Sequence, residues 1–287
     1  MSSPDSEGWR LRAANLISLD HWPSGRAGCS APPRVSTRGR VSAVAVAIML
    51  AGCAARPGPE TLDPVVERPQ GNRSVTVLAL TDRARTADKP SAFGDGRGTL
   101  SYEQFTIQAV KSAPDGNIGA VFMSRHSDPS KDFVITGRRE FDPASFQQSA
   151  ARLQKTADST VVFVHGYNTS YQEAVFRLAQ LSIEANTRAV PILFSWPSQA
   201  DFRGYVTDRD AATYARDDLV HLLTLLSRSP PKGRIAVVGH SMGAWLVMEA
   251  LRQLRLEGRG DVIARLQVGL ASPDIDIDEF GIESCLV

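Results

Sequence analysis

The chain has 287 residues, with 32 basic and 31 acidic side chains, so its formal net charge at pH 7 is only +1. This length suits one α/β domain with extensions and is enough to bury a substantial core. Because charges nearly cancel and no basic run is interleaved with aromatic residues, a nucleic-acid partner is not expected. The cysteines Cys29, Cys53 and Cys285 are too few and too scattered for a disulfide framework or a metal site.

Residues 1–34 carry no periodic apolar pattern, and they contain Trp9, Trp22 and several arginines. Two interpretations stay open. The segment is either disordered or a spurious extension from a start codon that was set too early. Neither interpretation gives it a function.

Residues 35–53 have the pattern of a secretory signal peptide. Arg38 and Arg40 precede a ten-residue apolar run, which is too short to span a bilayer, and the run leads into Leu50-Ala-Gly-Cys53. This ending resembles the lipobox of bacterial lipoproteins. The resemblance implies that Cys53 becomes the lipidated first residue of the mature chain and anchors it in the bacterial envelope, on the outer membrane or the periplasmic face. The alternative is a plain buried helix that happens to precede a cysteine.

Residues 54–72 are rich in proline and glycine and indicate an extended tether. We expect the domain to occupy residues 73–287, beginning with a strand at 75–80. Residues 82–100 are polar and contain glycines, which indicates a loop. Further strands are expected at 102–110 and 133–135, followed by a helix with Asp142 as its cap and Pro143 at its first position.

The second half of the chain alternates apolar strands with amphipathic helices. The run Ser159 to Gly166 is unbroken, as expected of a strand covered on both faces. The next helix is expected after capping-box spacing at Thr169 to Gln172. This alternation predicts an α/β fold with a doubly wound, mostly parallel sheet. The remaining predicted elements are strands at 191–196, 234–238 and 266–271 and helices around 219–226 and 244–254.

The pentapeptide Gly239-His-Ser-Met-Gly243 matches G-x-S-x-G between a predicted strand and a predicted helix. In that context the motif indicates a nucleophile elbow, in which Ser241 occupies a strained turn and both glycines are sterically required. The alternative is a chance match. Acyl transfer also needs donors for the oxyanion, and these are predicted to be the N–H groups of Met242 and of Tyr167. His165, in the same loop as Tyr167, is predicted to have a structural role.

Four segments together resemble a bacterial α/β-hydrolase family catalogued as domain of unknown function nine hundred. The resemblance extends from about Ser74 to Phe280 and implies an α/β-hydrolase fold with a serine nucleophile, but it supplies no substrate. The segments are Val162 to Asn168, Phe194 to Ser198, Val237 to Gly243 and Leu270 to Asp276.

The chain departs from the expected order of serine, acid and histidine. None of its five histidines follows Ser241, and His240 cannot reach around the elbow. Asp274 is the tentative acid, because it matches a family position, although a loop carboxylate is an equal alternative. We therefore expect a C-terminal truncation, and an uncovered sheet edge at Leu266 to Ala271. The remaining histidines are His21, His126, His165 and His221.

These observations predict an envelope-anchored serine hydrolase that cleaves an ester or related acyl bond through an acyl-enzyme. It is expected to be inactive as written, because the acid and histidine of the triad are missing. The expected partners are a small-molecule or lipid-like acyl substrate and the membrane that holds the anchor, and no cofactor is required by any motif. Two alternatives stay open: a non-catalytic envelope lipoprotein that uses the fold for binding, and a dead fragment of a broken gene.

Overall fold

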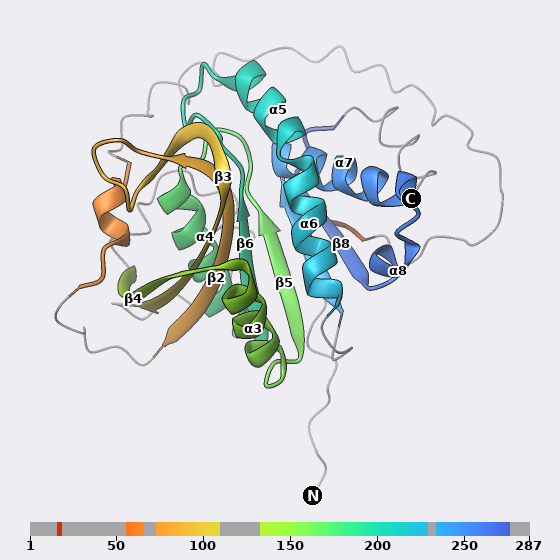
Figure 1. Cartoon of the computed structure of the whole chain (residues 1–287), viewed down its shortest axis with the longest axis horizontal. Coiled ribbons are helices and arrows are strands. Elements are labelled where there is room, and N and C mark those ends of the chain that lie inside the picture. Colours follow the sequence, from red (N-terminus) through yellow and green to blue (C-terminus); the bar gives the residue numbers. More distant parts are fainter. Residues whose placement is uncertain (1–15, 19–55, 66–72, 110–132, 229–233, 276–287) are drawn as a thin grey trace, which may run out of the picture.

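The computed structural model describes residues 16–18, 56–65, 73–109, 133–228 and 234–275, and every statement below concerns these residues. They form one sheet with the strand order β1-β8-β7-β5-β6-β2-β3-β4, with helices packed on its faces (Figure 1). The strands are β1 Leu16–Ser18, β2 Ser74–Arg85, β3 Phe93–Ala109, β4 Phe133–Phe141, β5 Ser159–Val164, β6 Ala189–Ser195, β7 Ile235–His240 and β8 Leu266–Ala271. The helices are the 3₁₀ turn η2 Pro59–Leu62, α3 Pro143–Gln154, α4 Tyr171–Ala185, α5 Tyr205–Tyr214, α6 Arg216–Ser227, α7 Met242–Leu256 and α8 Gly260–Ile263.

The centre of the sheet is parallel. Strands β8, β7, β5, β6 and β2 pair in parallel, whereas β1, β3 and β4 join antiparallel at the two sides. Helix α4 contributes to the apolar cluster on one face, and α3, α6 and α7 contribute to the cluster on the other. The predicted α/β class with a doubly wound, mostly parallel sheet is therefore confirmed.

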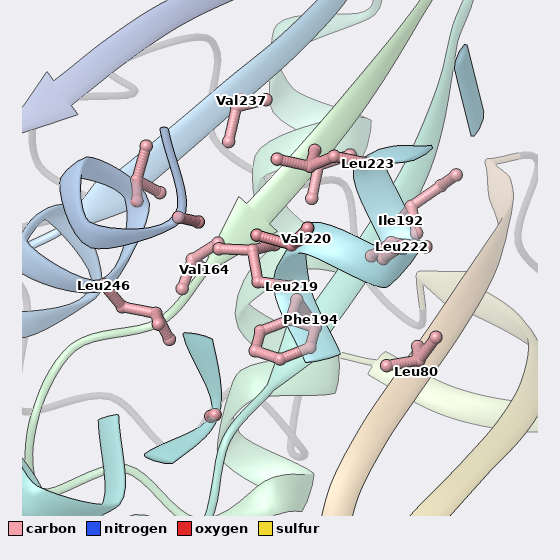
Figure 2. Packing of buried hydrophobic residues seen from close by; sticks show 14 of the residues in the cluster. Leu80, Val164, Ile192, Phe194, Leu219, Val220, Leu222, Leu223, Val237 and Leu246 are labelled. Carbon is pink, nitrogen blue, oxygen red and sulfur yellow. The ribbon is translucent and has the colours of Figure 1, made fainter. Parts of the chain in front are cut away.

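The larger of the two cores lies between the sheet and helices α6 and α7 (Figure 2). Leu80, Val164, Phe194 and Val237 come from four neighbouring strands, and all four are fully buried. Leu219 and Leu223 of α6 and Leu246 of α7 meet them. Strand neighbours such as Phe163 and Leu193 belong instead to the core on the α4 side. Burial on both faces explains why β5 and β6 are apolar without alternation.

The expectation of a loop over residues 82–100 is wrong. β2 continues to Arg85, and β3 begins at Phe93, so most of this stretch is strand. The ladder between the two strands carries register shifts on either side of Arg83, which are typical of bulges that increase strand twist. A Cβ added at Gly98 would lie 2.7 Å from the Cα of Ala84. The glycine thus permits close approach of two backbones, a role that composition alone does not separate from a loop.

The capping signals at the starts of two helices agree more closely with the structure than the loop expectation does. Asp142 accepts hydrogen bonds from the N–H groups of Ala144 and Ser145, so the predicted start of α3 is confirmed. The capping box of α4 exists, but it is formed by Ser170 and Glu173, one residue later than predicted. Helices α5 and α8 were not predicted.

Two segments outside the predicted domain pack against it. Leu16–Ser18 pairs with Gly269–Ala271, so the expectation that the outer edge of β8 is uncovered is wrong for these three residues, and residues 16–18 form a short strand. Within the predicted tether, Leu62 is buried and the N–H of Val65 donates to the carbonyl of Ile135 at 2.9 Å. The predicted signal peptide and Cys53 lie outside the described residues. In the part of the chain that the structure describes, no helix is long and apolar enough to cross a membrane.

Candidate active site

Ser241 stands at the junction of β7 and α7 with φ 51° and ψ −121°. A non-glycine residue rarely adopts this backbone conformation, and its strain of about 1–3 kcal/mol persists only where the surroundings fix it. The Ser241 N–H donates to the carbonyl of Ala271 at 2.9 Å, and its carbonyl accepts from Ala244 at 2.9 Å. The predicted strand, sharp turn and helix around this serine are therefore all present.

Both glycines of the motif allow backbone contact. A Cβ on Gly239 would lie 2.6 Å from the Cα of Ala244, inside the first turn of α7. A Cβ on Gly243 would overlap the carbonyl oxygens of Val164 and His165 at the end of β5. Real Cβ atoms do not approach backbone this closely, so α7 can start directly above the central strand only with glycine at these positions.

The elbow lies where the winding of the sheet reverses. After β5 the chain crosses to β6 on one side, and after β7 it crosses to β8 on the other, although β5 and β7 are neighbours. Ligand sites in open α/β sheets form at such a point, outside the carboxyl ends of the strands. A Cβ on Gly166 would lie 3.1 Å from the Cβ of Ser241. The loop after β5 thus lies against the serine, as the predicted oxyanion loop requires.

The loop that carries Tyr167 is held by a buried carboxylate. Asp208 of α5 is fully buried and accepts from the N–H of Asn168 at 3.1 Å and from the hydroxyl of Ser198 at 2.6 Å. Its other oxygen accepts from the N–H of Gln199 at 2.7 Å. Asn168 adopts a left-handed φ of 59°. Asp208 therefore fixes the backbone on which the Tyr167 N–H is carried.

The second predicted oxyanion donor is also at the elbow. Met242 is the first residue of α7, and no carbonyl of the described residues accepts from its N–H. The first N–H groups of a helix have no intrahelical partner and favour negative charge. Met242 can thus donate to an oxyanion that forms at Ser241.

Asp274 lies beside the elbow, but its carboxylate is directed elsewhere. Its N–H donates to the carbonyl of Ser241 at 3.2 Å, while its Oδ2 accepts from the hydroxyl of Tyr205 at 2.8 Å. The hydrogen bond to Asp274, followed by burial, raises the pKa of Tyr205. The Tyr205 ring also packs edge-on against Tyr167, with ring centroids 5.5 Å apart. Tyr205, which was not predicted from the sequence, therefore contacts both Tyr167 and Asp274, and Asp274 is joined to Ser241 through its backbone N–H.

His165 has the structural role that the sequence predicts. Its buried ring stacks on Trp196 with centroids 4.9 Å apart, and Nδ1 lies 2.8 Å from the carbonyl of Gly166. That oxygen can only accept, so Nδ1 carries the proton and Nε2 accepts, 3.1 Å from the hydroxyl of Ser195. Burial, followed by the charge of Arg83, lowers the pKa of His165 to about 3. The ring is neutral at physiological pH, and its hydrogen bonds go to groups other than Ser241.

Arg83 ties the loops of this edge together from inside. Its guanidinium is buried, and it donates to the carbonyls of Ser198 at 2.9 Å and Thr169 at 2.8 Å and to the hydroxyl of Ser195 at 3.1 Å. A further bond at 3.0 Å reaches Gly94 at the start of β3. Burial lowers the pKa of Arg83 to about 10, so it stays charged at neutral pH.

No described histidine forms a base for Ser241. The hydroxyl of Ser241 has no hydrogen-bond partner among the described residues. The ring of His221 on α6 is 3.4 Å from the hydroxyl of Tyr102. His126 and His21 lie outside the described residues. Within the described ranges, no group of three or more histidine, cysteine, aspartate or glutamate side chains could hold a metal ion.

Three residues of the site were not predicted from the sequence, for different reasons. Arg83 stood in a segment assigned to a loop. Asp208 and Tyr205 belong to a short polar helix, α5, whose sequence has no apolar stripe of helical period. A buried carboxylate and a buried guanidinium look like surface residues in a sequence, because only their surroundings distinguish them.

Residues 142–285 match the model of a protein family described as "Alpha/beta hydrolase of unknown function (DUF900)". A segment of 61 residues is 36% identical to an uncharacterized protein of Nostoc sp. (strain PCC 7120), covering 21% of this chain and 16% of that protein's length. No solved structure matches the chain.

Proposed function

Because the chain belongs to the family of alpha/beta hydrolases of unknown function, we propose that it is a serine hydrolase that cleaves an ester or related acyl bond. One observation carries the proposal. Ser241 occupies a strained turn at φ 51°, between the central strand and the start of α7, against the loop that contains Tyr167. A strained serine between the end of a strand and the start of a helix is typical of a functional nucleophile.

The proposed reaction has two halves. The Ser241 oxygen attacks the acyl carbon, and its proton passes to a general base. The negative charge that develops on the acyl oxygen is stabilised by the N–H groups of Tyr167 and Met242, each donor contributing roughly a hundredfold to a thousandfold in rate. The leaving alcohol takes a proton as its bond to the acyl carbon breaks. Water then releases the acid and restores the serine.

The proposed reaction also needs a general base for the Ser241 hydroxyl. A serine hydroxyl is almost fully protonated at neutral pH and is a weak nucleophile on its own. No described residue accepts its proton, so we propose that the base comes from outside the described ranges, with His126 the first candidate. Without such a base, the loss is on the order of a millionfold, against roughly a thousandfold retained by oxyanion donors and binding. The chain would then be inactive as written.

A fluorophosphonate probe with mass-spectrometric site mapping tests the proposal. If the base lies outside the described ranges, the probe labels Ser241, and this labelling is lost in Ser241→Ala and slowed in His126→Ala; if the triad is incomplete, as the sequence predicts, Ser241 is not labelled. Ser272→Ala is the matched control, because Ser272 is a neighbouring serine that also has a positive φ, of 46°. Labelling that survives Ser241→Ala, or that depends equally on Ser272, contradicts the assignment.

A second candidate function is a non-catalytic binding module on the same fold. The observation in its favour is that no histidine among the described residues hydrogen-bonds to the Ser241 hydroxyl, while the Asp274 carboxylate accepts from the hydroxyl of Tyr205. A chain that unfolds cooperatively yet shows neither probe labelling at Ser241 nor hydrolysis of p-nitrophenyl esters would favour this function over the hydrolase.

We also propose that the protein is lipid-anchored in the bacterial envelope through Cys53. The support is the sequence Leu50-Ala-Gly-Cys53 after a positive, then apolar segment. Metabolic labelling with palmitate is expected in the parent chain and in the matched control Cys285→Ser, and it is expected to disappear in Cys53→Ser. Equal labelling of all three chains would refute the anchor.

A further inference from the structure

The segment that follows the proposed anchor is fastened to the candidate site. Arg56 donates to the carbonyl of Ala200 at 2.7 Å and to the side-chain oxygen of Asn168 at 2.7 Å. It also lies 3.6 Å from the carboxylate of Glu173. Asn168 is next to Tyr167 in the loop that faces Ser241. The contacts of Arg56 therefore attach this segment directly beside the proposed oxyanion donor.

Further contacts keep the segment from swinging away. The carbonyl of Pro57 accepts from the side chain of Gln172 on α4 at 2.7 Å, and Leu62 is buried in the α4-side core. Asp63 pairs with Lys89 at 2.6 Å. This segment is thus part of the domain surface and not a free spacer, at least from Arg56 to Val65.

Cys53 precedes Arg56 by three residues. A fully extended chain spans at most about 3.6 Å per residue, so three residues of chain reach no further than about 11 Å. An acyl group on Cys53 would consequently enter the bilayer close to the loops of Asn168 and Ala200. A domain held at this point would present its carboxyl sheet edge to the membrane.

That same edge exposes large apolar side chains. Phe202 is 69% and Val206 is 74% exposed, and Tyr205 between them is partly exposed. Phe202 follows Ala200 by two residues, and its carbonyl accepts from the hydroxyl of Tyr167 at 2.6 Å. The guanidinium of Arg203 lies 5.2 Å from the centre of the Phe202 ring. Aromatic and aliphatic side chains next to arginines are suited to the interface between acyl chains and anionic headgroups.

We propose that Phe202, Tyr205 and Val206, at the start of α5, form a membrane-contact surface that places Ser241 at the level of the lipid headgroups, and that its substrate is an acyl ester held in that bilayer. The inference rests on the proposed function, since it names the substrate class of the same site and uses the proposed anchor. In Figure 1, α5 lies at the top, beyond the carboxyl end of β5. The Tyr167 loop and the elbow would then face the leaflet that carries the anchor.

The surface can be tested without the anchor. The parent is the full chain with Cys53→Ser, mixed with vesicles of phosphatidylethanolamine and phosphatidylglycerol. Adding Phe202→Asp and Val206→Asp together should lower the vesicle partition coefficient by at least about tenfold, because each side chain loses its apolar burial. Leu256→Asp is the matched control. Leu256 is 68% exposed but ends α7, which runs away from the carboxyl edge, and its partition should stay within about twofold of the parent.

Depth in the membrane gives a second measurement on the anchored protein. A cysteine at position 206 or 256, in a chain with Cys29→Ser and Cys285→Ser, is labelled with an environment-sensitive fluorophore. Spin-labelled lipids should quench the dye at 206 and leave the dye at 256 unaffected. Equal quenching at both positions, no quenching at 206, or a parent that does not bind vesicles overturns the membrane-contact surface.

Failure of the proposed function has a different signature. Palmitate labelling reports the anchor alone, and probe labelling of Ser241 reports the chemistry alone. If vesicle binding depends on Phe202 and Val206 while either label is missing, the surface stands and the corresponding part of the proposed function falls.

Discussion

A single buried carboxyl should make the stability of this domain depend on pH. Asp82 of β2 is fully buried, and among the described residues neither carboxyl oxygen has a hydrogen-bond partner. Burial, followed by the charge of Asp218 on α6, raises the pKa of Asp82 from 3.8 to about 7, although Arg83 and Arg97 oppose the shift. An ionised Asp82 is therefore a cost to the folded state.

The direction of the pH dependence follows from which state, folded or unfolded, holds the proton of Asp82. The folded state keeps the Asp82 proton up to about pH 7, whereas the unfolded chain releases it near pH 4. Stability is consequently lost as pH rises between these values. Three pKa units correspond to about 4 kcal/mol, which is an upper figure, and a domain has only about 5–15 kcal/mol in total. Asp82→Asn removes the ionisation and should remove this loss.

The comparison of pH profiles isolates the effect. A buried amide without partners has its own cost, about 1–3 kcal/mol, but that cost is the same at every pH. The unfolding free energy of Asp82→Asn minus that of the parent should thus rise by up to about 4 kcal/mol between pH 4 and pH 8. Urea denaturation followed by tryptophan fluorescence measures it at each pH.

Two further variants test whether Asp82 is the source of the pH dependence. Asp217→Asn is the matched control, since Asp217 is exposed on α6 next to Asp218 and its variant should give a pH profile parallel to that of the parent. Asp218→Asn removes the charge beside Asp82 and should reduce the pH dependence without abolishing it. If Asp82→Asn also runs parallel to the parent from pH 4 to pH 8, Asp82 does not hold its proton as argued.

Three other predictions concern the elbow and its supports. Gly243→Ala should lower the unfolding free energy by about 3 kcal/mol in denaturant titrations, because the new methyl overlaps carbonyl groups at the end of β5; an unchanged midpoint would contradict this. His165→Gln should weaken the loss of stability at acidic pH. Because the pKa of His165 is lowered to about 3 in the folded state, only the unfolded state binds the His165 proton between pH 6.5 and about 3. The parent therefore loses stability as pH falls through that range, and the variant should lose less. Tyr205→Phe should change stability by no more than about 1 kcal/mol, because the lost bond to Asp274 is partly exposed, and a larger loss in thermal unfolding would show that the contact holds α5 in place.

The central layer of this fold is accessible from sequence because its signals are local. β8 occupies 266–271 as predicted, and the start of α3 follows from one aspartate and one proline. The elbow combines a strand, two glycines and a helix in the continuous segment from Ile235 to Leu256, so it can be placed without knowledge of any distant contact. The confirmed parts of the prediction share this property.

The errors have one physical origin. Strand pairing of Leu16–Ser18 with β8, and of β2 with β3 beyond Arg83, depends on partners far away or on bulged registers that leave no periodic pattern. The residues that hold the loops of the site also depend on partners far away in the sequence. Asp208 and Arg83 look like surface charges until the loops that they hold are folded around them. The roles proposed for Ser241, Tyr167, Met242, Asp274 and Cys53 stay predictions.

The pairing of β1 has a consequence for maturation. β1 precedes Cys53, so cleavage directly ahead of that cysteine would separate Leu16–Ser18 from the polypeptide that retains β8. The partner positions Gly269–Ala271 would lose a neighbour immediately before the turn that leads to Asp274. The freed N–H and C=O groups would form an open edge able to pair with another extended segment. If the proposed cleavage at Cys53 takes place, the processed chain would expose at these three residues an edge that the uncleaved chain covers.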